Sequence, residues 1–231
     1  CGYMANSREA CDNRIYLLTS KVMYLFITNI WFLVTVSPFI IYFFISGENL
    51  SIPILTFLGI SIGPALSTMF SVMGRLMKDK QEVATRDYFH FYKINFAQGI
   101  FISAIINIVL MISYIDIGYF FSINMKIISY VFIALAIFMG AISLYIYPIL
   151  ARINAKTIDL FIISIKLVFK KFYITLTNIS LIIIGIAIVN FTSISLIATL
   201  FGASAVCYLI LRMEDSILSD VEVALKEKYS S

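Results

Sequence analysis

Long apolar runs alternate with short polar segments along the chain, and this alternation predicts an all-α polytopic membrane protein. Each run has about 20 residues or more, the length that an α-helix needs to cross ~30 Å of hydrocarbon. The expected membrane spans cover residues 22–46, 52–77, 98–117, 127–150, 172–190 and 193–211. Residues 1–231 therefore form a single integral membrane domain, which leaves no room for a separate soluble one.

Two of the expected spans contain proline, which favours a bend because it removes a backbone donor and clashes with the preceding turn. Pro38 lies in the first span, and Gly63-Pro64 lies near the middle of the second. The Gly63-Pro64 step has two interpretations: a kink with close packing, or a broken helix that lines a substrate site. Asn29 is likewise either an interhelical hydrogen bond or a ligand contact.

Two stretches between spans predict helices that lie on the membrane surface. Residues 85–97 place aromatic side chains on one helical face and basic side chains on another, and residues 157–171 form a second basic amphipathic stretch. Such helices bury their apolar face at the headgroup boundary. Both begin with the pattern Thr-x-Asp-x-Phe, at Thr85 and Thr157. The shared pattern and order of elements predict an internal repeat of residues ~52–117 and ~127–190.

The cations and aromatic rings around these stretches are candidate contacts to lipid or to a protein partner. They are Arg75, Lys78, Lys80, Arg86, Phe89, Tyr92, Lys93, Phe96, Lys166, Lys170 and Lys171. A second set, at which a helix break or a ligand cavity is expected, comprises Asn29, Pro38, Gly63 and Pro64.

The basic residues lie on one side of the expected spans. If the N-terminus is cytoplasmic, 16 of the 17 Lys and Arg residues fall in cytoplasmic segments, and Lys126 alone falls outside. The positive-inside rule therefore predicts that both termini, both surface helices and the acidic, helix-like tail of residues 212–231 are cytoplasmic. Anionic lipid on that side would contribute about 1 kcal/mol per nearby Lys or Arg.

Composition supports this class and offers little for catalysis. Hydrophobic residues make up 61% of the chain and charged residues 13%, against about a quarter charged in soluble domains. The net charge of +4 comes from basic residues that are distributed by membrane side, so nucleic acid is not an expected partner. His90 is the single histidine and the three cysteines lack metal-ligand spacing, so we expect neither a metal nor a cofactor.

No phosphate loop, CxxC pair or nucleophile motif is present, and we expect no enzymatic activity. No ionisable residue lies at the centre of an expected span, which argues against a proton-driven pump. His90 is expected to be solvated or lipid-facing rather than a proton relay. Cys1-Gly2 is either the lipidated start of a mature lipoprotein or an extension that precedes Met4.

Several of these segments together resemble a known family. Gly63-Pro64-Ala65, the basic loop and the stretch DYFHFYKINF at residues 87–96 resemble the YesL-like family of bacterial integral membrane proteins, as do Asn29, Trp31 and Pro38 in the first span. The resemblance extends over about residues 15–215. One departure is that residues 39–62 separate Pro38 from Gly63, whereas these motifs are closer together in the family.

The resemblance implies a protein without established catalytic residues, encoded beside sugar-uptake ABC transporters in low-GC Gram-positive bacteria. We therefore expect a non-enzymatic accessory protein of a bacterial carbohydrate ABC importer, which contacts the bilayer and docks permease or ATPase subunits. The alternative is a small-molecule membrane carrier or membrane-embedded substrate-binding subunit, with a site near Asn29, Pro38 and Gly63-Pro64. A membrane enzyme is the third interpretation. All three place the chain in the bacterial cell membrane, and the sequence leaves its oligomeric state open.

Overall fold

The computed structural model describes the chain except for residues 1, 48, 79–82, 154, 192–194 and 231. The described residues form helices and no strands, which confirms the predicted all-α class. The helices are α1 (Gly2–Ser46), α2 (Ile52–Gly59), α3 (Ile62–Met77), α4 (Ala84–Ser122), α5 (Lys126–Arg152), α6 (Thr157–Lys170), α7 (Phe172–Phe191) and α8 (Ser195–Ser230).

Six helical segments are long and apolar enough to cross a membrane. They are Thr19–Ser46, Ile52–Met77, Ala84–Ser122, Lys126–Arg152, Phe172–Asn190 and Leu196–Glu227. Large apolar side chains along them remain exposed, for example Phe44 (77%), Ile45 (80%) and Ile127 (81%). Exposure on this scale is unfavourable in water and is expected where lipid is the solvent. The segments define a multi-pass membrane protein.

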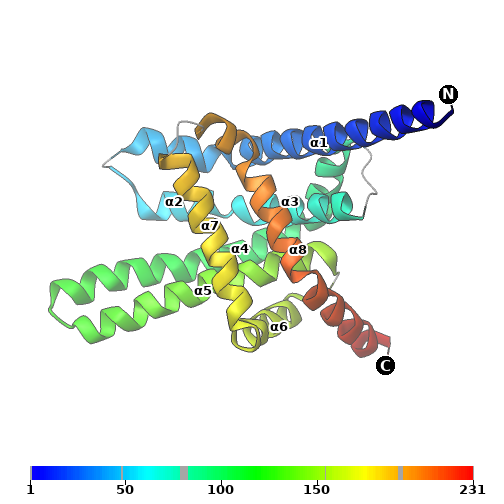
Figure 1. Ribbon diagram of the computed structural model, residues 1–231. Coiled ribbons are helices and arrows are strands. Elements are labelled where there is room, and N and C mark those ends of the chain that lie inside the picture. The colour runs from blue at the N-terminus through cyan, green and yellow to red at the C-terminus, as the bar shows by residue number, and fades with distance from the viewer. Residues whose placement is uncertain (1, 48, 79–82, 154, 192–194, 231) are drawn as a thin grey trace.

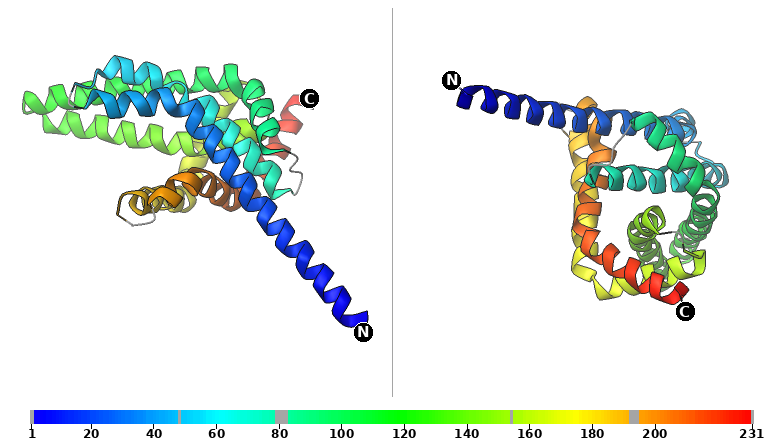
Figure 2. Two further views of the ribbon diagram at one scale, coloured as in Figure 1. Left: turned by 90° about the horizontal axis from the view of Figure 1, so that it is seen from above. Right: turned by 90° about the vertical axis from the view of Figure 1, so that its right-hand side faces the viewer.

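The helices form two hairpins that cross each other around a central helix. Figure 1 shows α4 and α5 as one long hairpin and α7 with α8 lying across it. Between the hairpins lies α3, which contacts α1, α4, α5 and α8. Figure 2 shows the first part of α1 projecting away from the other helices. Several of the most deeply buried core residues, such as Met69, Met73, Tyr88 and Tyr145, come from α3, α4 and α5.

The second predicted span is broken before its Gly-Pro step. Helix α2 ends at Gly59 and α3 begins at Ile62, so Pro64 lies in the first turn of α3. A proline fits this position because the first N–H groups of a helix have no intrahelical acceptor. A Cβ atom on Gly63 would lie only 2.4 Å from the Gly99 carbonyl oxygen of α4. The Gly63-Pro64 step therefore serves the close packing of α3 on α4.

Two other helices continue past a predicted boundary. Helix α4 continues through residues 85–97, for which a separate surface helix is predicted, and on through the span at residues 98–117. Figure 2 shows the start of α4 bending away from its remainder. In the second half, α6 ends at Lys170 and α7 begins at Phe172. The two halves of the predicted repeat thus differ in this connection.

Helix α8 likewise continues from the last span through most of the predicted tail to Ser230. Beyond residue 211 its inner side is buried, with Ile217, Leu218, Val221 and Leu225 all part of the core. The acidic residues of the tail therefore belong to a helix that packs against the other helices.

Candidate functional site

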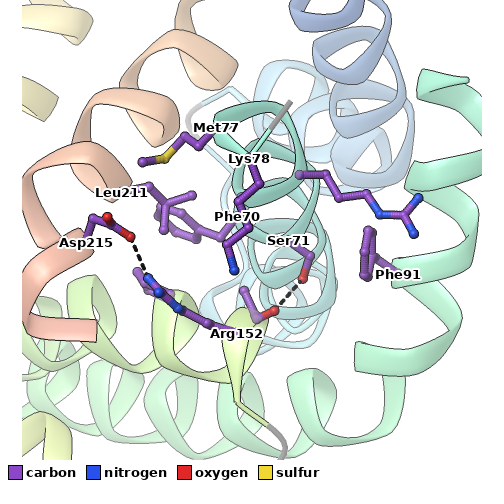
Figure 3. Close-up of a pocket in the computed structure, with 12 residues that line it drawn as sticks. Phe70, Ser71, Met77, Lys78, Phe91, Arg152, Leu211 and Asp215 are labelled. Carbon is purple, nitrogen blue, oxygen red and sulfur yellow. Dashed lines mark hydrogen bonds and ion pairs between the residues drawn. The ribbon is translucent and has the colours of Figure 1, made fainter. Parts of the chain in front are cut away.

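A cavity of about 310 Å³ lies where α3, α4, α5 and α8 meet (Figure 3). Its walls are mainly apolar, with three cations and one carboxylate among them. The lining residues are Phe70, Ser71, Gly74, Arg75, Met77, Lys78, Phe91, Pro148, Ala151, Arg152, Leu211 and Asp215. Figure 3 shows Lys78 reaching into the cavity from the end of α3. Two of the predicted contact residues, Arg75 and Lys78, are thus brought together here.

One wall of the cavity is fixed by hydrogen bonds between three helices. The Ser71 hydroxyl accepts from Asn95 Nδ2 at 2.9 Å, and its one proton is shared between the carbonyl oxygens of Ala151 at 3.1 Å and Ser67 at 3.0 Å. Ala151 lies in the last turn of α5, where carbonyl groups have no intrahelical donor. Ser71 therefore places a donor beside a carbonyl group at the end of α5, and it joins α3 to both α4 and α5.

Arg75 is paired with a buried carboxylate. Its Nη1 contacts Asp87 Oδ1, and its guanidinium group lies 5.2 Å from the centre of the Phe91 ring. Asp87 is almost fully buried, and its Oδ2 accepts a hydrogen bond from the Tyr24 hydroxyl at 2.7 Å. A buried charge requires such partners because its desolvation is costly. Asp87 thereby links α1, α3 and α4.

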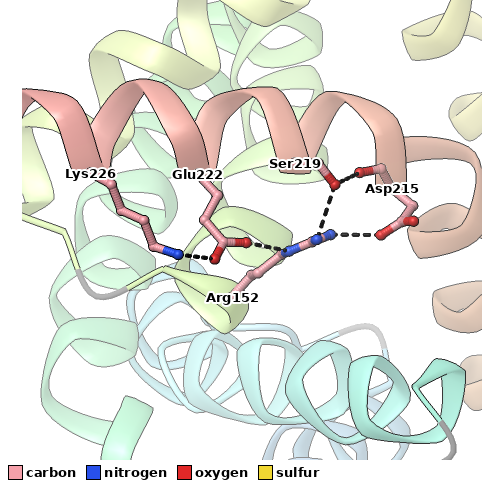
Figure 4. Close-up of polar contacts among 5 residues, drawn as sticks. All are labelled: Arg152, Asp215, Ser219, Glu222 and Lys226. Atoms are coloured by element: carbon pink, nitrogen blue, oxygen red, sulfur yellow. Dashed lines mark hydrogen bonds and ion pairs between the residues drawn. The ribbon is translucent and has the colours of Figure 1, made fainter.

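Arg152 binds one face of α8 (Figure 4). Its Nη1 donates to Asp215 Oδ1 at 2.7 Å, its Nη2 to Ser219 Oγ at 3.1 Å, and its Nε to Glu222 Oε2 at 3.1 Å. Lys226 Nζ contacts the other oxygen of Glu222 at 2.8 Å. The four α8 positions follow i, i+4, i+7 and i+11 spacing, which places them on one face of the helix. We call this group the Arg152 clamp.

The sequence alone does not indicate the Arg152 clamp. Arg152 is one of the basic residues of the predicted cytoplasmic side, and Asp215 and Glu222 belong to the predicted acidic tail. The helical spacing of the acidic positions was visible in the sequence. The partner was not, because Arg152 is 63 residues from Asp215 and 70 from Glu222 in the chain.

A shallow groove of about 450 Å³ runs along the start of α4, and we call it the α4 groove. Its lining residues are Val83, Thr85, Arg86, Phe89, His90 and Lys93. Trp31 of α1 supports it, since its Nε1 donates to Thr85 Oγ1 at 3.0 Å and its ring lies 4.7 Å from that of Phe89. Arg86, His90 and Lys93 are exposed. The α4 groove thus collects three of the predicted contact residues: Arg86, Phe89 and Lys93.

The aromatic rings of this stretch do not share one environment. Tyr88 is fully buried, and its hydroxyl is 2.8 Å from the Thr35 hydroxyl of α1. Tyr92 is half-buried beside it, whereas Phe89 and Phe96 are 38% and 44% exposed. Tyr88 is therefore a core residue, and the exposed rings are the ones available for lipid or a partner.

Helix α6 has a buried side and an exposed side. Leu160, Leu167 and Val168 face the core. The exposed side carries Lys166 and Lys170 together with large apolar residues, which include Ile158 (73% exposed) and Phe169 (70% exposed).

The remaining predicted contact residues lie elsewhere. Lys171 lies between α6 and α7, and its carbonyl accepts hydrogen bonds from Tyr145 and Thr175. Lys80 lies outside the described residues.

Two of the residues predicted for a helix break or ligand cavity, Asn29 and Gly63, lie at contacts between helices. Asn29 is fully buried, donates to the Thr199 carbonyl at 2.9 Å and accepts from the Ser204 N–H at 3.1 Å. Both partners lie on α8, so Asn29 is an interhelical hydrogen-bonding residue. Gly63 packs against α4, while Pro38 is exposed within an uninterrupted α1.

The fold and the six candidate spans define the class of the chain, a multi-pass membrane protein. A family model described as "Protein of unknown function, DUF624" matches residues 25–117. The match extends from α1 into α4 and so includes Arg75, Asp87 and the α4 groove. No significant match was found among curated proteins or among solved structures. The chain is thus similar to DUF624 proteins over its first half, and its resemblance to the YesL-like family stays a prediction.

Proposed function

We propose that the protein is a non-enzymatic accessory subunit of a bacterial carbohydrate ABC importer. It docks the permease or ATPase subunits through the α4 groove and the exposed side of α6. The observation that carries the proposal is the combination of exposed aromatic rings with cations on these two elements. The choice of a carbohydrate importer rests on the YesL-like resemblance, and the non-enzymatic part rests on the missing catalytic motifs.

A side-chain contact joins the two elements near the start of α6. Gln98 of α4 donates to the Ala155 carbonyl at 2.8 Å and to Thr157 Oγ1 at 3.2 Å, so α4 is tied to the start of α6. Exposed aromatic side chains and arginine are enriched among the residues that dominate protein interfaces. Phe89 with Arg86, and Phe169 with its neighbouring lysines, supply this combination.

The proposal also includes an orientation in the membrane. The start of α4 and α6 lie at the cytoplasmic headgroup boundary, as amphipathic surface segments of two repeated halves, and both termini are cytoplasmic. The exposed rings contact acyl chains or the partner, while Lys166, Lys170, Arg86 and Lys93 face headgroups or acidic partner residues. Each cation near anionic lipid contributes about 1 kcal/mol.

Site-specific photo-crosslinking in native membranes tests this docking surface. A photoreactive amino acid replaces Phe89 or Phe169. The matched control replaces Tyr130, which is 60% exposed and lies near the start of α5, at the end of this helix away from α6. We expect adducts with permease or ATPase subunits from positions 89 and 169, and none from position 130. Adducts with lipid alone at all three positions would remove the basis of the proposal.

A second candidate function, a small-molecule carrier or substrate-binding subunit, is favoured by the cavity between α3, α4, α5 and α8. Its volume of about 310 Å³ is at the lower end of the usual range for ligand sites. Apolar walls formed by Phe70 and Leu211, with Lys78 reaching into the cavity, suit a small amphipathic or anionic molecule. A thermal-shift screen with sugars and sugar phosphates tests it. We expect stabilisation that the cavity-filling variant Leu211→Trp loses, and a screen without stabilisation would reject this function.

A further inference from the structure

A wholly buried carboxyl group lies between α7 and α8. Glu214 of α8 is 0% exposed, and so is Asn178 of α7. Asn178 Nδ2 donates to Glu214 Oε1 at 2.6 Å. An ionisable side chain buried within membrane-crossing helices is costly and commonly marks a functional site. Glu214 lies just beyond the predicted span of residues 193–211, so its burial inside the protein is not predictable from hydropathy.

Two buried oxygen atoms of this pair lack a hydrogen-bond partner. Among the residues that the structure describes, neither Glu214 Oε2 nor Asn178 Oδ1 has a donor within reach. Buried polar atoms are nearly always paired, because an unpaired one keeps its desolvation cost. An ionised Glu214 would worsen this state, because it would add a full negative charge and another acceptor but no donor.

The neighbouring hydroxyl groups are engaged with other atoms. Tyr145 of α5 and Thr175 of α7 lie 2.9 Å apart, oxygen to oxygen, and both also reach the Lys171 carbonyl, at 3.4 and 3.3 Å. Tyr145 interacts electrostatically with Glu214 and is the titratable group that α5 contributes. The α7 neighbours, Asn178 and Thr175, are uncharged.

Charged groups on the other helices lie on different faces of α8. Arg212 and Asp215, which flank Glu214, are exposed, and Asp215 is held by the Arg152 clamp. From α3, Arg75 and Lys78 line the cavity on the Asp215 side of α8. Helix α1 meets α8 through Asn29 at Thr199 and Ser204, more than two turns before Glu214. No described cation thus pairs with the Glu214 carboxyl group.

We propose that Glu214 and Asn178 form a proton-binding site, with one proton held between Glu214 Oε2 and Asn178 Oδ1. The protonated Oε2 donates to Oδ1 while Nδ2 continues to donate to Oε1. This closed acid–amide pair satisfies both open oxygens and leaves the carboxyl group neutral. Loss of the proton puts a carboxylate oxygen opposite an amide oxygen and weakens the contact between α7 and α8. The proposal is independent of the partner of the protein and goes beyond the docking function.

Infrared spectroscopy of the full-length protein in lipid nanodiscs tests the site directly. A protonated carboxyl group has a C=O stretching band that an ionised carboxylate lacks. We expect this band at neutral pH, its complete loss in Glu214→Gln and a change in its frequency in Asn178→Ala. Glu227→Gln, which alters an exposed carboxyl group on the same helix, is the matched control and leaves the band unchanged.

A second readout connects the site to the fold. The side-chain amide in Glu214→Gln can make both hydrogen bonds without binding a proton, so this variant should fold. The wild type should become less stable to heat as the pH rises, because Glu214 loses its proton. The melting temperature of Glu214→Gln should lack this pH dependence. If that variant does not fold, 13C-labelled glutamate in the wild type assigns the band instead. A carboxylate signal from Glu214 at neutral pH would overturn the proposal. Loss of the band on replacing choline chloride with NaCl at constant pH would also overturn it, because the site would then prefer Na⁺.

Discussion

The Arg152 clamp predicts that one arginine holds the second half of α8 against α5. Replacing Arg152 with Met keeps most of the apolar stem and removes the three donors to Asp215, Ser219 and Glu222. We expect the free energy of unfolding to fall by about 1–3 kcal/mol, the range for hydrogen bonds to charged groups in a partly exposed network. Hydrogen exchange should increase in residues 215–226 before it increases elsewhere in α8.

Solvent exposure determines how the lost free energy of unfolding divides between the Arg152 pairs with Asp215 and with Glu222. The Glu222 side chain is 29% exposed and that of Asp215 is 53% exposed, so the Glu222 pair is less screened by water. In double-mutant cycles we expect a coupling of about 1 kcal/mol between Arg152→Met and Glu222→Gln, and about half of that with Asp215→Asn. Lys226→Met removes an exposed i,i+4 pair and should cost only about 0.3–0.5 kcal/mol.

Chemical denaturation in mild detergent, followed by circular dichroism, gives the free energies for these cycles. Coupling below about 0.3 kcal/mol for both carboxylates, with unchanged hydrogen exchange in α8, would refute the reasoning. It would mean that apolar packing alone positions the second half of α8.

Three further predictions concern contacts between helices. Gly63→Ala should lower the melting temperature because its Cβ would collide with α4, at a cost of about 1–3 kcal/mol, whereas Gly74→Ala, which meets nothing within 4 Å, should be neutral or stabilising. Asn29→Ala should cost about 1–2 kcal/mol in unfolding by denaturant, because two hydrogen bonds to α8 are lost. Asp87→Asn should cost about 1–3 kcal/mol, because it leaves the half-exposed Arg75 without its counter-charge, and Arg75→Met in the same background should recover part of this loss. Equal melting temperatures for the two glycine variants would contradict the close packing at Gly63. An unchanged free energy of unfolding in Asn29→Ala would contradict the hydrogen bonds to α8. A destabilisation by Asp87→Asn that is just as large in the Arg75→Met background would contradict the ion pair.

The positions of the spans could be predicted from the sequence because lipid requires long apolar helices, and hydropathy alone identifies them. Helix ends were harder to predict. The break between α2 and α3 lies before Pro64, because a proline is tolerated in a first turn, and nothing in the sequence distinguishes this from a kink at the proline. Tyr88 belongs to the stretch 85–97, for which helical spacing predicts an aromatic face at the membrane surface. Helical spacing relates residues of one helix only, whereas the burial of Tyr88 comes from packing against α1, where its hydroxyl meets that of Thr35.

The candidate site was only partly predictable for the same reason. Arg86, Phe89 and Lys93 follow from local spacing and do lie in one groove. The clamp between Arg152 and Glu222 and the pair of Asn178 with Glu214 join helices that are distant in the sequence. An amphipathic pattern indicates which residues share a face, but the helix that covers this face depends on tertiary packing.

The measurement that tests the docking proposal most directly is affinity purification of the tagged full-length protein from native membranes in mild detergent, with mass spectrometry of the associated proteins. We predict near-stoichiometric ABC permease or ATPase subunits with the wild type and with Lys126→Glu, a charge reversal at the opposite end of the α4–α5 hairpin. The same subunits should be lost with the double variant Arg86→Glu/Lys93→Glu, at an unchanged expression level. Recovery of the wild-type protein alone would contradict the proposed function, and equal recovery of the subunits with all variants would exclude the α4 groove as the docking surface.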